Sequence, residues 1–270
     1  MNRSVTALAG VLLCALLAGC SIFGSTEDKR KDWTAEQYYK AAKEELDNGN
    51  WGDAAKLYEA LESKFPYGRF AQQAQLEVGY VYYKEGETAQ AIASADKFMK
   101  LHPNHPAVDY AMYLKGLANF KEDLGPLARL PMWKQDLADR DPRAARESFE
   151  VFKELVARFP NSPYAEDSRE RMAYLIEALA RHEVKTAQYY LLRGAPLAAV
   201  NRAQEVITHF PNSPSRKDAL DVMVQGYDRM GMKNLRDDAK RVLAMNYPED
   251  PLSAAGKNNN KPWWKFWGAN

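Results

Sequence analysis

The sequence has little net charge, few cysteines and no hydrophobic run of membrane-spanning length. Its 37 basic and 36 acidic side chains leave a formal charge of +1. The chain therefore lacks the basic excess with which nucleic-acid-binding proteins release counterions, and we expect no nucleic acid among its partners. Two cysteines in 270 residues exclude a disulfide-rich scaffold. A mean hydropathy of −0.55 excludes a polytopic membrane protein.

Catalytic and metal-binding patterns are also missing. The sequence contains no GxSxG, HExxH, P-loop or dinucleotide-binding motif. His102 and His105 have the spacing of a metal-binding pair, but prolines follow both and no acidic third ligand lies nearby. Acidic pairs such as Glu44-Glu45 are more typical of solvated helix faces than of acid–base catalysis. We therefore expect no enzyme, no metal site and no cofactor other than a covalent lipid.

That lipid is indicated by the first 20 residues. Arg3 precedes an apolar stretch, Val5 to Leu17, which at about 13 residues is too short to span a bilayer comfortably. The stretch runs into Leu-Ala-Gly-Cys20, which resembles the lipobox of bacterial lipoproteins. The resemblance implies a signal peptide over 1–19, acylation of Cys20 and a lipidated tether over 20–32. Ser21, in place of an aspartate, favours sorting to the outer membrane.

Prolines mark an internal repeat in the rest of the chain. An aromatic residue or histidine precedes proline at 65–66, 102–103, 159–160, 210–211 and 247–248. Glycines lie 17 residues before four of these prolines, at positions 49, 86, 194 and 231. Small residues lie 12 before four of them, at positions 54, 91, 148 and 199. The pattern resembles the tetratricopeptide repeat, in which a glycine turn joins two helices that touch at a small residue. We expect an all-α solenoid of about five helix pairs.

The repeats depart from a regular spacing at identifiable places. The third repeat is lengthened by residues 121–142, where we expect a loop insertion. Residues 164–182 predict a lengthened helix, and Arg236 takes the small-residue position of the fifth repeat. The string FPNSP occurs at 159–163 and again at 210–214. There we expect Asn or Ser to cap the next helix and the second proline to occupy its first turn.

The first helices of stacked repeats form a concave surface. The repeat register places five residues on it, namely Tyr39, Lys43, Tyr80, Tyr83 and Lys84. Tyrosine offers a flat contact area with a hydroxyl group, and lysine can meet a peptide carboxylate. An aromatic turn that contains Phe65 and Tyr67 borders this region. For each tyrosine, packing between helices is an equally good interpretation.

The last 20 residues, 251–270, differ from the rest and are expected to form a flexible basic tail. They contain three lysines, no acidic residue and the aromatic group Trp263, Trp264, Lys265 and Trp267. Tryptophan beside lysine suits a lipid headgroup interface or the groove of a partner. The alternative is that the tail folds back onto the last repeat.

The lipobox, the repeats and the length together resemble the BamD (ComL-type) family of outer-membrane assembly lipoproteins. Stretches that support the resemblance beyond the repeat itself include 47–51, 82–84, 189–190 and 200–202. The resemblance implies a non-enzymatic subunit of the β-barrel assembly (BAM) complex on the periplasmic face of the cell outer membrane.

The same resemblance implies that the two halves of the chain bind different partners. The N-terminal repeats, 33–120, would receive C-terminal segments of unfolded outer-membrane proteins. The C-terminal repeats, 143–250, would dock the periplasmic domains of the barrel subunit BamA, and other BAM lipoproteins would join. Arg202 falls on the family's arginine that engages an acidic partner residue, although a surface helix charge is the alternative. The rival functions are a periplasmic repeat adaptor for cell-wall machinery and a peptidoglycan-active enzyme.

Overall fold

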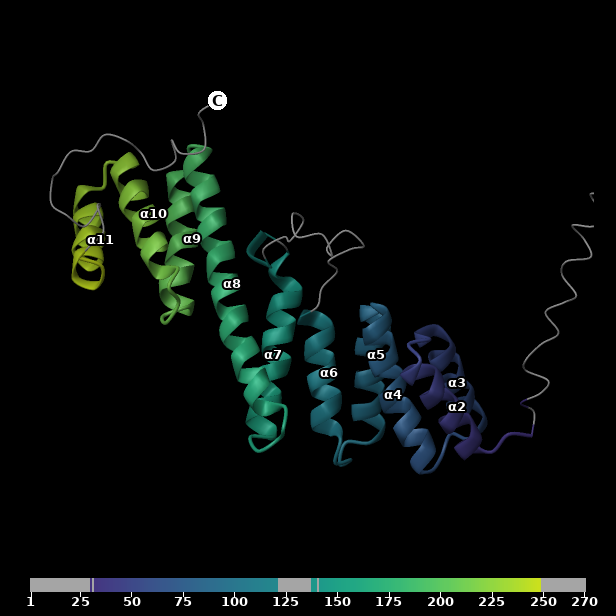
Figure 1. Ribbon diagram of the computed structural model, residues 1–270. Helices are drawn as coiled ribbons and strands as arrows, with labels where there is room; N and C mark the ends of the chain where they lie inside the picture. Colours follow the sequence, from purple (N-terminus) through teal and green to yellow (C-terminus); the bar gives the residue numbers. More distant parts are fainter. Residues whose placement is uncertain (1–29, 31, 121–136, 140, 249–270) are drawn as a thin grey trace, which may run out of the picture. The chain divides into compact units, whose positions relative to one another are not determined.

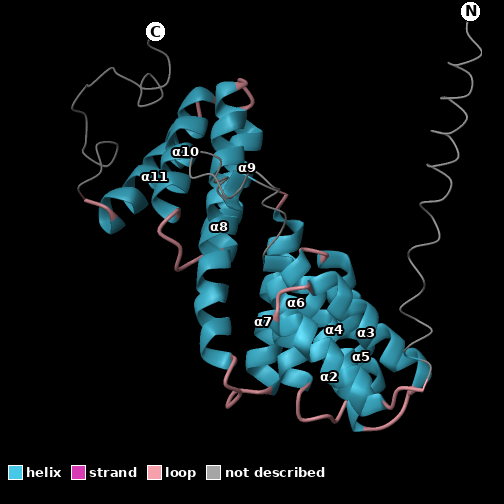
Figure 2. Cartoon of the chain, turned by 45° about the vertical axis from the view of Figure 1, so that its right-hand side comes forward, coloured by secondary structure: helices cyan, strands magenta, loops and turns pink. Residues whose placement is uncertain are grey.

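The computed structural model describes residues 30, 32–120, 137–139 and 141–248, and the regular elements in these residues are helices (Figures 1 and 2). The predicted signal peptide, Cys20, most of the expected insertion and the predicted tail with its tryptophans lie outside the described residues. No helix in the described ranges is both long enough and apolar enough to cross a membrane.

The chain divides into two compact units, Met1–Val81 and Tyr82–Asn270. The first unit contains α2 (Ala35–Asp47), α3 (Trp51–Lys64) and most of α4 (Arg69–Glu85). The second contains the end of α4, α5 (Thr88–Leu101), α6 (Val108–Phe120), the short 3-10 helix η5 (Leu137–Asp139), α7 (Pro142–Arg158), α8 (Ala165–Leu192), α9 (Pro196–His209), α10 (Arg216–Arg229) and α11 (Lys233–Asn246). In chain order these α-helices are the five pairs that the repeat predicts.

The turns and contacts within the pairs follow the repeat. The repeat glycines lie in the turns after α2, α4, α8 and α10 with φ between 71° and 94°, a left-handed conformation that favours glycine: Gly49, Gly86, Gly194 and Gly231. The small residues of the second helices have no exposed surface: Ala54, Ala91, Ser148 and Ala199. Both features confirm the reading of the sequence as tetratricopeptide repeats.

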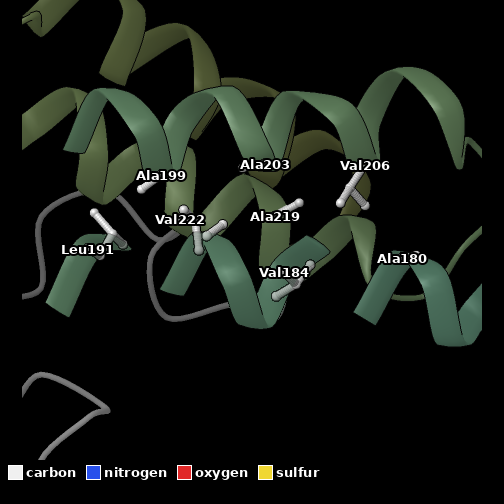
Figure 3. Close-up of a cluster of buried hydrophobic side chains, with 9 residues drawn as sticks. Ala180, Val184, Leu191, Ala199, Ala203, Val206, Ala219 and Val222 are labelled. Atoms are coloured by element: carbon white, nitrogen blue, oxygen red, sulfur yellow. The ribbon is translucent and has the colours of Figure 1, made fainter. Parts of the chain in front are cut away.

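Within the second unit, α8 packs against α7, α9 and α10, and its 28 residues confirm the predicted lengthened helix. Figure 3 shows a buried cluster that α8 shares with α9 and α10 and that consists mainly of alanine and valine. Because these side chains are small, the helix axes can approach closely. At Gly226 of α10, an added Cβ would lie 2.4 Å from the side chain of Val200 on α9. This half of the chain is therefore held by close helix packing.

The two FPNSP copies behave differently from the prediction. Helix α8 begins at Ala165 and α10 at Arg216, so Pro163 and Pro214 precede even the N-cap residues and do not occupy the first turn. Neither N-cap side chain makes a capping hydrogen bond. The expectation that these prolines start the helices was wrong.

The serines of the two copies explain why. The Ser162 hydroxyl donates to the carboxylate of Asp109 on α6 at 2.7 Å, and the Ser213 hydroxyl donates to Glu177 on α8 at 2.5 Å. Each serine oxygen also accepts a backbone N–H two residues further on, at 3.2 and 3.0 Å. The serines thus tie the inter-repeat turn to an acidic residue of the preceding repeat, and the helix begins after that turn.

The fifth pair ends the repeats with a polar contact. Arg236 replaces the small residue and donates to Asp228 at 2.9 Å and to Asp237 at 2.8 Å. Helix α11 still packs through Ala239 and Leu243, which are buried. The irregular fifth repeat expected from the sequence is therefore a helix pair with an ion-paired crossing.

Candidate functional site

The first unit has an open hollow of about 700 Å³ along α2. Residues spaced three and four apart line it, because these positions share one face of a helix. They are Glu36, Tyr39, Lys40, Lys43, Glu44, Asp47 and Asn48, joined by Phe70 of α4. The hollow thus combines one aromatic side with a run of charged groups of both signs.

The aromatic side is built on a buried tyrosine. Tyr58 of α3 is fully buried, and its ring lies 5.9 Å from that of Tyr39. The ring of Tyr39 also lies 5.6 Å from Phe70, whose ring in turn carries the Arg69 guanidinium at 4.7 Å. Tilted rings at these distances are in favourable contact. Packing therefore holds Tyr39 in place and leaves it half-buried at the hollow.

The carboxylate of Glu77 interacts with these rings and with charges of both signs. Burial raises the pKa of Glu77 on α4, Asp47 raises it further, and Lys43 opposes them. Burial, followed by the charge of Glu77, also raises the pKa of both Tyr39 and Tyr58. The Tyr58 hydroxyl has no hydrogen-bond partner within the described residues. Burial therefore disfavours two polar groups behind Tyr39, the Glu77 carboxylate and the Tyr58 hydroxyl.

The predicted client-binding residues lie at different places. Tyr39 and Lys43 are brought together in the hollow, where Lys43 lies 3.9 Å from Asp47. Phe65 ends α3 and packs against Tyr38, with 6.4 Å between ring centroids. Tyr67 is 91% exposed in the turn before α4.

The remaining three predicted client-binding residues lie on α4: Tyr80 in the first unit, and Tyr83 and Lys84 in the second. Tyr80 and Tyr83 are partly buried, whereas Lys84 is exposed in the last turn of the helix. The lining of the hollow includes none of the three.

Glu77 was missed by the sequence reasoning. It lies seven residues after Phe70 and so on the same face of α4. That spacing was an available signal, but exposed glutamates with the same spacing are common on helices.

The second unit places Arg202 in an ion-pair network. The Nη1 atom of Arg202 on α9 donates to Glu183 Oε2 at 3.1 Å. The Nη2 atom of Arg146 on α7 donates to Glu183 Oε1, also at 3.1 Å. The Glu183 side chain is only 6% exposed, whereas those of Arg146 and Arg202 are 59% and 47% exposed. A buried carboxylate therefore carries a half-exposed arginine on each of its oxygens.

The spacing of apolar residues along α8 indicates in the sequence that Glu183 is buried. Along α8, buried residues recur every four positions: Leu175, Leu179, Glu183, Ala187 and Leu191. A glutamate inside such an apolar stripe is buried by its position and needs a cation. Arg146 and Arg202 provide the positive charges that pair with this buried carboxylate.

The two histidines that have the spacing of a metal-binding pair pack against a phenylalanine. The His102 and His105 rings lie 5.3 and 5.2 Å from the ring of Phe98, in the turn between α5 and α6. Within the described ranges, no three His, Cys, Asp or Glu side chains gather where they could hold a metal ion. The contacts of both rings with Phe98 agree with a packing role in this inter-repeat turn.

These helix pairs define a helical-repeat protein of the tetratricopeptide type. The chain belongs to the family described as "Outer membrane lipoprotein" (YfiO), whose model matches residues 31–242.

Several relatives cover nearly the whole chain. A protein of Neisseria gonorrhoeae is 43% identical over 96% of this chain and 98% of its own. A protein of Neisseria meningitidis serogroup A is 42% identical with the same coverage. One of Vibrio cholerae is 35% identical over 88% of this chain and 97% of its own. All three are named outer membrane protein assembly factor BamD.

Proposed function

We propose that the chain is a non-enzymatic lipoprotein subunit of the outer-membrane β-barrel assembly complex. The observation that carries the proposal is the 42% identity, over nearly the full length of both chains, to relatives named as assembly factors of outer membrane proteins. The lipobox at Cys20 supports a lipid anchor that would hold the repeats at the periplasmic face of the outer membrane. Several acyl chains on one residue would give durable anchoring.

In this proposal the hollow on α2 receives the C-terminal segment of an unfolded outer-membrane protein. Tyr39 and Phe70 offer an aromatic surface on which an apolar client side chain can pack. Lys40 and Lys43 stand beside it and can pair with a terminal carboxylate. Three acids line the same hollow, namely Glu36, Glu44 and Asp47, so an anionic client group must meet a lysine directly. The lining of the hollow has two lysines and three acidic residues, so it has no excess of positive charge.

The C-terminal repeats hold the barrel subunit BamA in the same proposal. Arg202 is half-exposed, and one of its nitrogens is engaged by Glu183. Its other N–H groups can donate to an acidic side chain of the partner. Two surfaces on two units of one chain would thus join a client and the barrel subunit, and other lipoproteins of the complex would associate with the same scaffold.

The client-binding half can be tested with a peptide. A fluorescent peptide with the sequence of an outer-membrane protein C-terminus would be titrated with the wild-type chain and with Lys43→Glu. We expect the variant to bind about tenfold more weakly, because it reverses the charge that meets the terminal carboxylate. Amidation of the peptide C-terminus should weaken binding to the wild type and change binding to the variant little.

A matched control is available on the neighbouring helix. Lys56 of α3 is exposed and pairs with Asp53 at 2.9 Å, much as Lys43 pairs with Asp47. Lys56→Glu should bind the peptide like the wild type. Equal binding by Lys43→Glu and the wild type would contradict the proposed role of the hollow. A separate co-purification after mild detergent extraction distinguishes the adaptor function, which would recover cell-wall enzymes instead of the barrel subunit.

A further inference from the structure

Glu183 binds two arginines from different helices at once. Arg146 comes from α7 and Arg202 from α9, and α8 lies between these helices in the sequence. Each arginine donates to a different oxygen of the same carboxylate, at 3.1 Å in both cases. Because a carboxylate is small and rigid, this arrangement holds the two guanidinium groups as neighbours.

The charges of this group do not cancel. Two arginines and one glutamate leave one positive charge, and the single negative charge lies buried under the positive ones. A guanidinium has five N–H donors, and neither arginine donates to another side chain of the described residues. Both are about half exposed and therefore present unused donors to solvent while bound to the same carboxylate.

We propose that Arg146 and Arg202 together form a receptor for one carboxylate of the partner, and that Glu183 positions both. This inference rests on the proposed function and adds Arg146 and Glu183 to the contact expected for Arg202. Two planar donor groups that converge on one acidic side chain can offer it more hydrogen bonds than one arginine can. Because Glu183 already holds both in place, little side-chain entropy is lost on binding.

The arrangement favours an acidic protein side chain as the occupant. The exposed part of the group is cationic and formed by guanidinium groups, which match the geometry of a carboxylate. A purely structural tie between α7, α8 and α9 is the competing explanation. The structural explanation requires the arginines only for the stability of the fold. The receptor requires them for affinity as well.

The test measures affinity and folding on the same variants. The full-length lipidated chain in mild detergent would be titrated against the immobilised periplasmic domains of the barrel subunit. The variants are Arg146→Gln, Arg202→Gln and the double variant, since glutamine retains an N–H donor for Glu183. Arg158→Gln is the control, because Arg158 is a half-exposed, ion-paired arginine on the same helix as Arg146. Thermal unfolding by circular dichroism reports on the fold.

We expect each single variant to bind about tenfold more weakly, with the control unchanged. The double variant should lose less than the product of the two single losses, because both arginines hold the same carboxylate. Arg146→Lys, which keeps the charge but not the planar group, should lose less than Arg146→Gln.

Positioning by Glu183 has its own readout. Glu183→Gln increases the positive charge of the group but releases the arginines from their shared anchor. Weaker binding in this variant, despite the added charge, is the result expected from positioning. Stronger binding would overturn that role.

Wild-type affinity in Arg146→Gln together with a loss in Arg202→Gln would overturn the receptor and leave the proposed function intact. Independent, multiplicative losses would also overturn it, because the arginines would then meet separate groups. If the wild-type chain does not bind the barrel subunit, the proposed function fails and the receptor fails with it.

Discussion

Glu77 in the first unit and Glu183 in the second are carboxylates near candidate binding surfaces, but their surroundings differ. Glu77 faces Lys43, whose effect Asp47 opposes, and burial raises its pKa. Glu183 is more deeply buried and has an arginine on each oxygen. In the first unit, Glu77 and the buried Tyr58 hydroxyl are therefore polar groups that burial disfavours, next to the ring of Tyr39. In the second unit, the carboxylate is fully paired and the unused donors belong to its arginines.

This difference agrees with the two tasks of the proposed function, receiving a client and holding the barrel subunit. An unfolded client presents varied sequences, and a hollow with both signs of charge and an aromatic surface can accommodate them. In the proposed function the barrel subunit would present one surface, for which the two paired arginines are suited. The predictions below test whether the two carboxylates differ as described, from the largest expected effect to the smallest.

Removing both arginines should have the largest effect on stability. In Arg146→Ala/Arg202→Ala, Glu183 stays buried without a cation, and we expect the free energy of unfolding to fall by about 3 kcal/mol. The matched change in the first unit is Lys43→Ala, where an exposed pair at 3.9 Å should contribute under about 1 kcal/mol. Urea unfolding measures both. Similar losses in the two variants would contradict the comparison.

Replacing Glu77 should have a smaller and pH-dependent effect. Because its folded pKa is raised, the folded chain favours the protonated form, so the stability from this group is present below its ordinary value of 4.5 and lost as the pH rises through the folded value. Glu77→Gln should therefore raise the melting temperature at pH 7 and leave it unchanged at pH 4. A lower melting temperature at pH 7 would show that Glu77 has a stabilising partner.

Removing the Tyr58 hydroxyl should have the smallest effect. The hydroxyl is buried without a hydrogen-bond partner among the described residues, so Tyr58→Phe removes an unsatisfied polar group and keeps the ring contact with Tyr39. We expect a gain of about 1 kcal/mol in the free energy of unfolding. A clear loss would reveal a partner for the hydroxyl, such as an ordered water.

The repeat pattern predicted most of the fold, because backbone geometry requires particular residues at particular positions. A left-handed turn favours glycine at position 49, and a close helix crossing requires a small residue at position 54. The FPNSP turns were predicted less well. Ser162 can cap a helix or bind Asp109, and the sequence does not show which acid will lie within reach.

The candidate site was predicted in part. The repeat register found Tyr39 and Lys43, which share a face of α2, and the family resemblance indicated Arg202. The sequence did not predict a role for Glu77 or Glu183, and the reason is physical. In the sequence, Glu183 differs from other charged helix residues only in lying among the buried apolar positions of α8. Its partner Arg146 lies 37 positions away in the sequence. Long-range charge pairing depends on tertiary packing, which local pattern does not encode.

One experiment tests the central claim that the two surfaces act separately. Full-length wild type, Lys43→Glu and Arg202→Gln would be recovered from membranes after crosslinking, and each would be scored for both the barrel subunit and an unfolded outer-membrane protein. We predict that Lys43→Glu loses the client and keeps the barrel subunit, and that Arg202→Gln shows the reverse. Loss of both partners in each variant, with the fold intact, would contradict the separation of the two surfaces.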